Sequence, residues 1–508
     1  MVMRNKIDSN ETGLSYAEEA SLGVLPVTPI WIPAEPNSYD DFGGELTLLA
    51  RNPINSSRQR KKGVITDLDA SGGFNQDFTQ SNFQDLLQGV MFADFRKKLE
   101  IVTTSVSATA YVVADASAME IGALVFASGF SKPQNNGFKI VTDVTGASPA
   151  ETDIEVAGLS AEATAGKLVV VGMSTDAGDL DIDVSGPLPV ITSTSLDFTT
   201  LGLIAGEWIF VGGDTSINGF TNAANNGFKR VSNVAAHALT IDLSQTTMVT
   251  EANAAQTVQL FFGRVLKNEL GALIKRRSYQ LERQLGVPDT DAPSEVQSEY
   301  LVGAVANEFV LNIAQADKIN ADISFVATDN EQRTATIGLK AGTRLPLVET
   351  DAFNTSSDFA MLRMNIIDPA NANPDPLFAF LTELKITINN NVTPNKAVAV
   401  LGAFDVTAGT FQVSAEATAY FATIEAVQAV RQNKNVEINA AVVKENAGFV
   451  IDLPLVALGD GRLDVSQDDP ITLPATMDAA TAVKINPNTD FTTLWVFFDY
   501  LPTLAQPE

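Results

Sequence analysis

Hydrophobic and polar residues alternate in the same order in two parts of the chain. From Glu45 to Phe95, a strand-like run is followed by a long polar loop, a second strand, a Gly-rich turn and a helical pattern. The same succession recurs from Glu383 to Arg431. We therefore predict a mainly β protein with two tandem domains, each carrying a flanking helix.

The helix is the most strongly marked element of the first copy. Ser81 and Gln84 have the spacing of a capping box. Apolar residues recur around them at helical spacing: Phe83, Leu86, Leu87, Val90 and Met91. The glycines of the 70–74 stretch predict a turn before this helix.

In the second copy, Glu383 to Ile388 takes the place of Glu45 to Leu49, and a loop over 389–396 precedes a strand over 398–406. A Gly turn and a helix from Ile424 to about Arg431 complete the copy. Alternating runs elsewhere predict further strands at 279–285, 308–313, 319–326, 436–442, 449–453 and 471–477.

Residues between the first helix and the later strands of the first copy form a repeat of their own. The pentapeptide Asn-Asn-Gly-Phe-Lys occurs at 135–139 and at 225–229, and Asn-Gly between β-type runs is a strong hairpin signal. We predict two small inserted β modules, and expect that both can be deleted without loss of the host fold. The predicted boundaries are 1–104 with 264–344 for the first of the tandem β domains, 105–175 and 176–263 for the modules, and 345–508 for the second domain.

The segments that lead into the two domains, and the end of the chain, have distinctive compositions. Residues 1–44 are rich in proline, glycine and aromatic residues and predict an extended arm rather than a core element. Residues 345–382 are expected to be the equivalent arm of the second domain. The apolar stretch from Phe491 to Leu501 is expected to dock on a sheet.

Composition restricts the chemistry of this chain. Its 508 residues include no cysteine and one histidine, His237, which argues against disulfide frameworks, zinc sites and Ser-His-Asp triads. The sequence contains no P-loop, dinucleotide fingerprint or nucleophile elbow. We therefore predict no catalytic residue, no cofactor and no metal site, and expect His237 to be a packing or surface residue.

The charge distribution has one prominent exception. The formal net charge is -28, from 33 basic and 61 acidic residues, which argues against tight binding to nucleic-acid phosphates. The dense basic run comprises Arg58, Arg60, Lys61 and Lys62. Three interpretations are a solvated hairpin tip, a phosphate contact and a partner contact. Because the rest of the chain is acidic, another copy of the protein is a suitable electrostatic partner.

Two further stretches bear on binding and location. The acids Asp176, Asp179, Asp181 and Asp183 lack the glycine and spacing of an EF-hand loop, so a solvated linker is expected in preference to a Ca²⁺ site. Met1 to Glu11 has no apolar signal-peptide core, and no run reaches the ~18 apolar residues of a membrane span. We expect the protein to be made in the cytoplasm and to have no membrane partner.

Several stretches resemble the major tail tube proteins of bacteriophages with long, non-contractile tails. They are Asn37–Glu45, Arg51–Ile54, Ser57–Gly63, Gly73–Phe78 and Asp85–Gly89. The likeness covers 16–100 and 300–500. It implies β-sandwich or half-barrel domains with a flanking helix, whose inner sheets join between copies into closed rings. Stacked rings would form the hollow tube of the virion tail, with a tape-measure protein and a tail terminator as partners, and double-stranded DNA would pass through it without specific binding.

The resemblance also implies an oligomeric state. Single-domain subunits of this kind close a ring with six copies, so a chain with two tube domains is expected to form homotrimeric, pseudo-hexameric rings. The basic run from Arg58 to Lys62 would contact an adjacent subunit or the next ring. Two other hypotheses stay open: a β-rich fibre or adhesin whose modules bind surface carbohydrate, and an enzyme such as a glycoside hydrolase, which needs two positioned carboxylates.

Overall fold

The structure is a computed structural model that describes residues 7, 9–52, 54, 56, 59–146, 152–253, 255–287, 296–334, 337–378 and 380–507. The chain divides into two compact units. Unit 1 comprises Met1–Ala93, Glu269–Thr355 and Thr382–Ala417, and unit 2 comprises Asp94–Asn268, Ser356–Leu381 and Thr418–Glu508. Strands dominate both units, which confirms the predicted mainly β fold.

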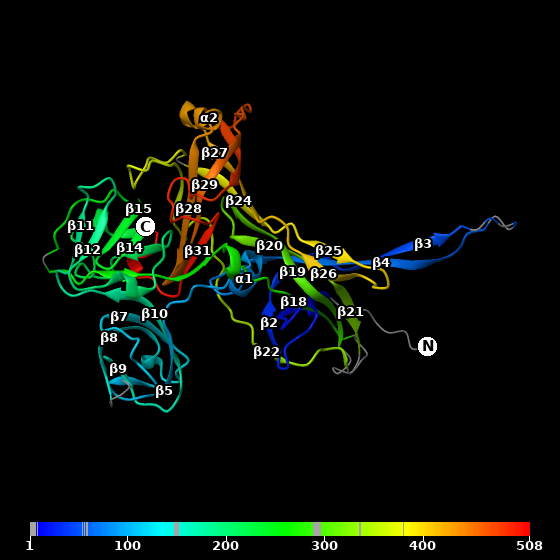
Figure 1. The fold of residues 1–508 in the computed structure, drawn as a ribbon, viewed down its shortest axis with the longest axis horizontal. Coiled ribbons are helices and arrows are strands. Elements are labelled where there is room, and N and C mark those ends of the chain that lie inside the picture. Colours follow the sequence, from blue (N-terminus) through cyan, green and yellow to red (C-terminus); the bar gives the residue numbers. More distant parts are fainter. Residues whose placement is uncertain are drawn as a thin grey trace. The chain divides into compact units, whose positions relative to one another are not determined.

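Unit 1 consists of largely antiparallel strands and one α-helix (Figure 1). Its elements are β1 (Gly13–Glu18), β2 (Ile30–Ala34), β3 (Pro36–Arg51), β4 (Lys61–Asp77), α1 (Gln84–Met91), β18 (Tyr279–Gly286), β19 (Gln297–Ala314), β20 (Asn320–Ala327), β21 (Asp329–Arg333), β22 (Thr343–Arg344), β24 (Leu381–Asn389), β25 (Thr393–Lys396) and β26 (Ala403–Thr407). β27 (Gln412–Tyr420) runs from unit 1 into unit 2. Figure 1 shows β3 and β4 extending as a long two-stranded hairpin.

The turn predicted over 70–74 is wrong, because β4 continues straight through these residues. Their glycines serve close packing instead. A Cβ on Gly72 would lie 2.9 Å from the Cα of Phe42, and one on Gly73 would lie 2.6 Å from the carbonyl oxygen of Ile323. Glycine inside a strand often marks such a close approach.

The predicted capping box is also wrong, although the helix itself is confirmed. α1 begins at Gln84 with Phe83 as its N-cap, and no side chain caps it. The helix is held by burial instead, since Leu86, Leu87, Val90 and Met91 are all buried. Phe83 stacks on Phe78 with ring centroids 5.4 Å apart, which fixes the entry of the helix.

The N-terminal segment is part of the core of unit 1 and not merely an extended arm. β1 pairs antiparallel with β18 along Gly13 to Glu18, and also with β2. Tyr16 and Trp31 are buried. The prediction that residues 1–44 contribute no core element is therefore wrong for the described residues.

Unit 2 contains both inserted modules and most of the second copy. Its elements are β5 (Glu100–Val106), β6 (Ala110–Val113), β7 (Ala123–Ser128), β8 (Gly137–Thr145), β9 (Asp153–Val156), β10 (Lys167–Ser174), β11 (Leu180–Asp183), β12 (Val190–Ser193), β13 (Trp208–Val211), β14 (Gly227–Ala235), β15 (Ala238–Ser244), β16 (Gln259–Phe261), β17 (Arg264–Lys267), β23 (Phe359–Ile366), α2 (Ile424–Arg431), β28 (Asn435–Lys444), β29 (Ala447–Asp460), β30 (Thr472–Ala479) and β31 (Leu494–Phe498). The strand order is β5-β6-β9-β8-β7-β10 in the first module and β11-β12-β15-β14-β13-β16 in the second, so the modules share one topology.

The repeated pentapeptide does not form a hairpin turn, contrary to prediction. The first asparagine of each copy is the last residue of a short 3-10 helix, and the side chain of the second asparagine closes the preceding loop. Asn136 Nδ2 donates to Phe130 O at 2.8 Å, and Asn226 Nδ2 donates to Phe220 O at 3.0 Å. The glycine that follows each asparagine begins β8 or β14 with a positive φ, 87° and 97°.

The modules share a hydrophobic core with the C-terminal strand. Trp208, Phe210 and Phe261 of the modules cluster with Val496 and Phe498 of β31. This confirms that the C-terminal segment docks on a sheet. It also removes the basis for expecting a harmless deletion of the modules, because the deletion would expose a face that β31 now buries.

The two copies have matching strand orders after their helices. In unit 1, β18, β19 and β20 pair antiparallel in that order. In unit 2, β28, β29 and β30 do the same. These pairings fit the predicted duplication, and the strands expected after each helix are confirmed.

The alignment of the first strands of the two copies differs from prediction. Leu68 of β4 and Val406 of β26 are both buried and both follow an aspartate. Asp67 pairs with Thr47, whereas Asp405 pairs with Asn395 of β25. β25, rather than 383–388, therefore corresponds to the stretch after Glu45. The predicted strand over 398–406 is likewise wrong at its start, since β26 begins at Ala403. Buried and exposed residues alternate in the same way along the whole of a long strand. This alternation therefore does not show which of two successive stretches corresponds to a given stretch in the other copy.

Candidate assembly interface

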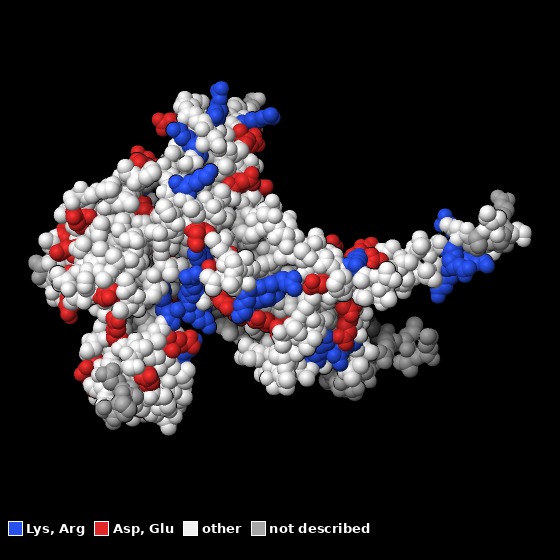
Figure 2. Space-filling view, in the orientation of Figure 1, with Lys and Arg blue, Asp and Glu red and all other residues white. Residues whose placement is uncertain are grey.

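The β3–β4 hairpin carries the predicted basic run. Arg58 lies outside the described residues, whereas Arg60, Lys61 and Lys62 are exposed. Lys61 pairs with Arg51 across the hairpin. Figure 2 shows Lys and Arg atoms gathered on the outer part of the hairpin. The described part of the run therefore forms one positive surface.

The same hairpin exposes apolar side chains on both strands. They are Leu46, Leu48, Leu49, Val64 and Ile65, and Leu48 is the most exposed at 67%. An isolated two-stranded hairpin is marginally stable in water, and a contiguous exposed apolar patch commonly marks an interaction site. We call the segment from Gly44 to Val64 the arm.

The first copy joins the second through a strand pair. Glu308 to Ala314 of β19 pairs antiparallel with Glu383 to Asn389 of β24. The side chain of Asn389 donates to Glu308 Oε2 at 2.8 Å across this pair. The edge of the first copy's sheet is thus covered by the leading strand of the second.

Packing strengthens this junction within unit 1. Phe92 and Val305 of the first copy form a buried cluster with Val392 and Val406 of the second. Asn390 Nδ2 donates to the carbonyl oxygens of Val90 at 2.8 Å and Ala306 at 3.1 Å. The turn after β24 therefore covers the C-terminal end of α1.

Ion pairs complete the junction. Lys396 Nζ lies 2.5 Å from Asp67 Oδ2 and 2.5 Å from Asp69 Oδ1. Hydrogen bonds to the two carboxylates raise the pKa of Lys396, and the hydrogen bond from Lys396 lowers the pKa of Asp67. Arg276 pairs with Asp405 at 3.4 Å. Sequence reasoning missed these residues, because isolated charges in the second copy's loop give no periodic signal.

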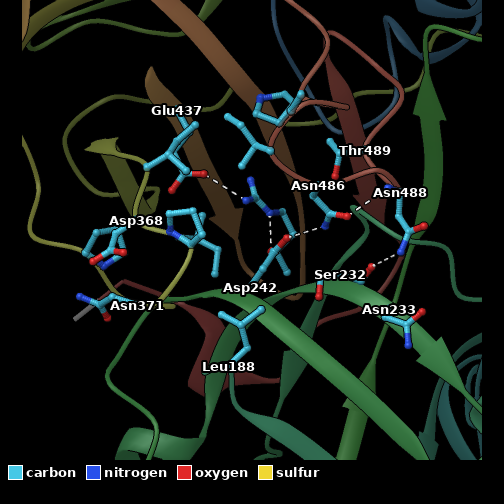
Figure 3. Close-up of a pocket in the computed structure, with 18 of the residues that line it drawn as sticks. Leu188, Ser232, Asn233, Asp242, Asp368, Asn371, Glu437, Asn486, Asn488 and Thr489 are labelled. Carbon is cyan, nitrogen blue, oxygen red and sulfur yellow. Dashed lines mark hydrogen bonds and ion pairs between the residues drawn. The ribbon is translucent and has the colours of Figure 1, made fainter. Parts of the chain in front are cut away.

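A pocket of about 270 Å³ in unit 2 has buried charges in its wall. Arg230 pairs with Asp242 at 2.7 Å, with Glu437 at 3.0 Å and with Asp452 at 3.1 Å. In Figure 3, dashed lines join Asp242 and Glu437, which come from different elements, to the side chain that lies between them. Burial raises the pKa of Glu437 to about 7, with Asp452 and Asp242 adding to the effect and Arg230 opposing it. Because each acid is engaged by Arg230, the arrangement is a structural ion cluster between the second module and the second copy.

The acids between the modules are also structural, and the linker prediction is wrong. Asp181 and Asp183 lie on β11, a strand of the second module. Asp179 accepts hydrogen bonds from Ser193, Thr194 and Ser195. Burial would raise its pKa, but these bonds lower it to about 2. The carboxylate is thus used to hold the start of the module.

The remaining candidate features are structural as well. His237 is exposed, and its Nδ1 lies 2.9 Å from Leu196 O. It is therefore a surface residue. Among the described residues, no group of three or more His, Cys, Asp or Glu is arranged to hold a metal. No helix in the described ranges is long and apolar enough to cross a membrane.

Comparison with known proteins identifies the family. The family model of the phage tail tube protein matches residues 9–479. No curated protein matches the chain. The match supports a structural role in the virion tail. The chain belongs to the phage tail tube protein family and is a structural protein of a bacteriophage tail.

Proposed function

We propose that copies of this chain self-assemble into stacked rings, which form the hollow tube through which double-stranded DNA passes to the host. The observation that carries the proposal is the pairing of β19 with β24. Within one chain, the leading strand of the second copy closes a sheet edge of the first. The equivalent edge of the second copy would then be closed by pairing with the leading strand of another chain.

The second copy presents an edge of the required kind. In the first copy, Asn312 of β19 pairs with Asn320 of β20 beside the stretch of β19 that β24 covers. In the second copy, the equivalent pair is Asp464 with Thr472. Asp464 follows β29, whose last residues pair with β30 in the described part of the chain. An open strand edge is a ready site for pairing with another chain.

The complementary edge belongs to β3. Among the described residues, β4 pairs with one side of β3, and no strand is seen to pair with its other side. The first half of β3, residues 36–41, corresponds in order to β24, which precedes β25. We therefore infer that β3 of one copy pairs with the edge after β29 of the next, as β24 pairs with β19.

This contact is heterologous, because it joins two different surfaces. Heterologous contacts close a ring only at a fixed rotation. If six tube domains surround the channel, three two-domain chains fill the ring, and junctions within and between chains alternate. The proposal keeps 1–104 with 264–344 and 345–508 as the two tube domains, and 105–175 and 176–263 as modules outside the tube wall.

The arm supplies a second contact. The short hairpin β25–β26 of the second copy is anchored to the first copy through Lys396. The longer β3–β4 arm instead has exposed apolar and basic residues. We assign Arg58, Arg60, Lys61 and Lys62 to a contact with an adjacent subunit or the next ring, where the acidic chain supplies complementary charge.

The charge of the chain suits the passage of DNA. DNA carries one negative charge per ~1.7 Å of helix axis, so a net negative lumen would not hold it. Tubes would assemble in the host cytoplasm around a tape-measure protein and end at a tail terminator. In this role the chain is a scaffold and performs no catalysis.

Electron microscopy and native mass spectrometry of the purified protein test the proposal. We expect rings and tubes with a central channel, and a ring mass of about 162 kDa, three times the 54.0 kDa chain. A protein that stays monomeric across the concentrations at which tubes are sought, or that forms solid fibres without a channel, would contradict it.

A further inference from the structure

A short segment ahead of β23 is fixed to the first copy in unit 1. Ala352 forms an antiparallel bridge with Thr79. Phe353 N donates to Phe78 O at 3.0 Å, and Ile319 N donates to Phe353 O at 2.8 Å. The buried ring of Phe353 lies 6.4 Å from that of Phe78. The entry segment of the second copy therefore clamps the end of β4 beside α1.

The first copy has an equivalent entry segment at the N-terminus. β1 pairs antiparallel with β18, with Gly13 opposite Gln284. β23 pairs in the same way with β28, with Phe359 opposite Val442. A 3-10 turn over Ser9–Glu11 precedes β1, and a turn over 355–357 precedes β23. The two entry segments thus share both their strand pairing and the turn before it.

This equivalence assigns a counterpart to Phe353. Ile7 and Phe353 each stand six residues before the first residue of their strand (13 − 7 and 359 − 353). Ile7 is half-buried and lies beside Gly286, where a Cβ would meet it at 3.3 Å. Ile7 is therefore the apolar residue positioned to act as Phe353 does, on the copy that precedes it in a ring.

The second copy contains the matching acceptor. Phe421 N donates to Ile471 O at 3.0 Å, as Phe78 N donates to Ile319 O at 2.8 Å. The burial of the two sites differs, since Phe78 is 0% exposed whereas Phe421 is half-buried and Ile471 is 38% exposed. The clamp that covers the first site has no counterpart over the second within the described residues.

The helix beside this acceptor is uncovered too. α1 buries four large or medium apolar side chains, whereas α2 buries Ala426 and Ala429. Ile424, at the start of α2, is 56% exposed. Tyr420 is 37% exposed on the preceding strand. We call the region of unit 2 that carries these two residues, Phe421 and Ile471 the α2 face.

We infer that the N-terminal segment of one copy docks on the α2 face of a neighbouring copy and places Ile7 against Phe421 and Ile471. The inference rests on the proposed assembly into rings, because the neighbouring copy supplies the segment. Each subunit would then be connected to the next in the ring by its N-terminal segment, just as residues 350–355 connect the two copies within a chain.

Thiol cross-linking tests this directly, because the chain has no cysteine of its own. An Ile7→Cys chain is mixed with an Ala422→Cys chain, and rings are treated with a short thiol-to-thiol cross-linker. Ala422 is exposed and corresponds to Thr79, the bridge partner of Ala352. We expect a cross-linked dimer of about 108 kDa, twice 54.0 kDa, in rings and not in the unassembled mixture.

The control pairs Ile7→Cys with Val483→Cys, an exposed position of unit 2 away from the α2 face. Rings that form normally but yield no Ile7–Ala422 product, or yield the control product equally, would overturn the inference while leaving ring assembly intact. Cross-linking inside an unassembled chain carrying both Ile7→Cys and Ala422→Cys would assign the face to the chain's own N-terminus and also overturn it. The absence of rings from the wild-type protein would instead count against the proposed function.

A second variant measures the contribution of the contact. Ile7→Asp should raise the protein concentration needed for assembly by about tenfold or more, because it removes a buried aliphatic side chain. Ile7→Val should have a much smaller effect. An unchanged melting temperature of the unassembled Ile7→Asp chain would show that the fold is intact. Assembly of Ile7→Asp at wild-type concentration would contradict the inference.

Discussion

Lys396 Nζ lies 2.5 Å from Asp67 Oδ2, and this ion pair ties a hairpin of the second copy to a strand of the first. Asp69 is held by the same cation at 2.5 Å. The contact lies in unit 1, beside the β19–β24 pair. It shows how the two copies meet within one chain, and in the proposed assembly successive subunits would meet in the same way.

Removing this cation should loosen the junction without unfolding unit 1. We expect Lys396→Ala to increase amide hydrogen exchange in β25 and β26, since the pair anchors that hairpin, with little change in melting temperature because exposed pairs add little stability. Lys385→Ala is the control, as Lys385 makes a longer, exposed contact of 4.0 Å with Glu416. Equal exchange in the two variants would remove Lys396 from this role.

Charge reversal on the arm should block tube growth. Lys61→Glu with Lys62→Glu leaves the fold of the unassembled chain intact, because both side chains are exposed, but it places negative charge against an acidic neighbour. Lys97→Glu with Lys484→Glu makes the same change in net charge at exposed sites elsewhere. Sedimentation should show tubes for the control pair and none for the arm pair; tubes from both would exclude an electrostatic role for the arm.

Apolar contact by the arm can be tested separately. Leu48→Ser removes a side chain that is 67% exposed in the single chain, so the melting temperature should change little, yet assembly should require a higher concentration. Ile121→Ser is matched, since Ile121 is 59% exposed on a module. Light-scattering titrations compare the two variants. If Leu48→Ser and Ile121→Ser assemble alike, the arm is not a buried contact.

The buried cluster around Arg230 predicts a pH dependence. Burial raises the pKa of Glu437 from 4.5 to about 7, so the folded state holds this proton more tightly than the unfolded state. Its contribution to stability is full below about pH 4.5 and is lost as the pH rises to 7. The loss amounts to roughly 3 kcal/mol by the free energy per pH unit. Above pH 7, Lys229 acts in the opposite direction, because burial lowers its pKa to about 7.

Denaturation of the unassembled chain between pH 5 and 7 measures this effect. Glu437→Gln should flatten the decline in the stability of unit 2, because the proton-binding difference is removed. Glu416→Gln, at a side chain that is 66% exposed, should retain the wild-type slope. A wild-type slope in Glu437→Gln would mean that Glu437 does not titrate in this range.

The shared core predicts that the modules cannot be deleted freely. Trp208 is fully buried, and its Nε1 donates to Asp452 at 2.9 Å. Trp208→Ala should cost about 3–5 kcal/mol of unfolding free energy in unit 2, and deletion of 105–263 should give an insoluble or markedly destabilised chain. Trp208→Phe keeps most of the buried area and should cost less. A soluble deletion variant with an unchanged melting temperature would show that β31 does not need the modules.

Sequence periodicity predicted the elements that bury one clear face. Leu86, Leu87 and Val90 follow the helical period and are buried in α1. The C-terminal run became β31 because five consecutive apolar residues can only be buried on both faces. Here local pattern and tertiary packing agree, so the sequence sufficed.

Errors arose where tertiary packing decides a residue's role. Gly72 and Gly73 indicate a turn by composition, yet they lie in β4 because Phe42 and Ile323 approach too closely for a side chain. Asn136 was placed in a hairpin, but its amide closes a loop around Phe130. Of the interface, the basic run was visible as a charge cluster. Lys396 was not, because its partners lie more than 300 residues earlier in the chain.

Image reconstruction of the assembled tube tests the central claim most directly. We predict rings of three chains, in which the segments Glu45 to Phe95 and Glu383 to Arg431 alternate around the channel, and in which β3 of one chain continues the sheet beyond β29 of its neighbour. Rings of six chains with true sixfold symmetry, or a neighbour contact that leaves β3 unpaired, would contradict the account.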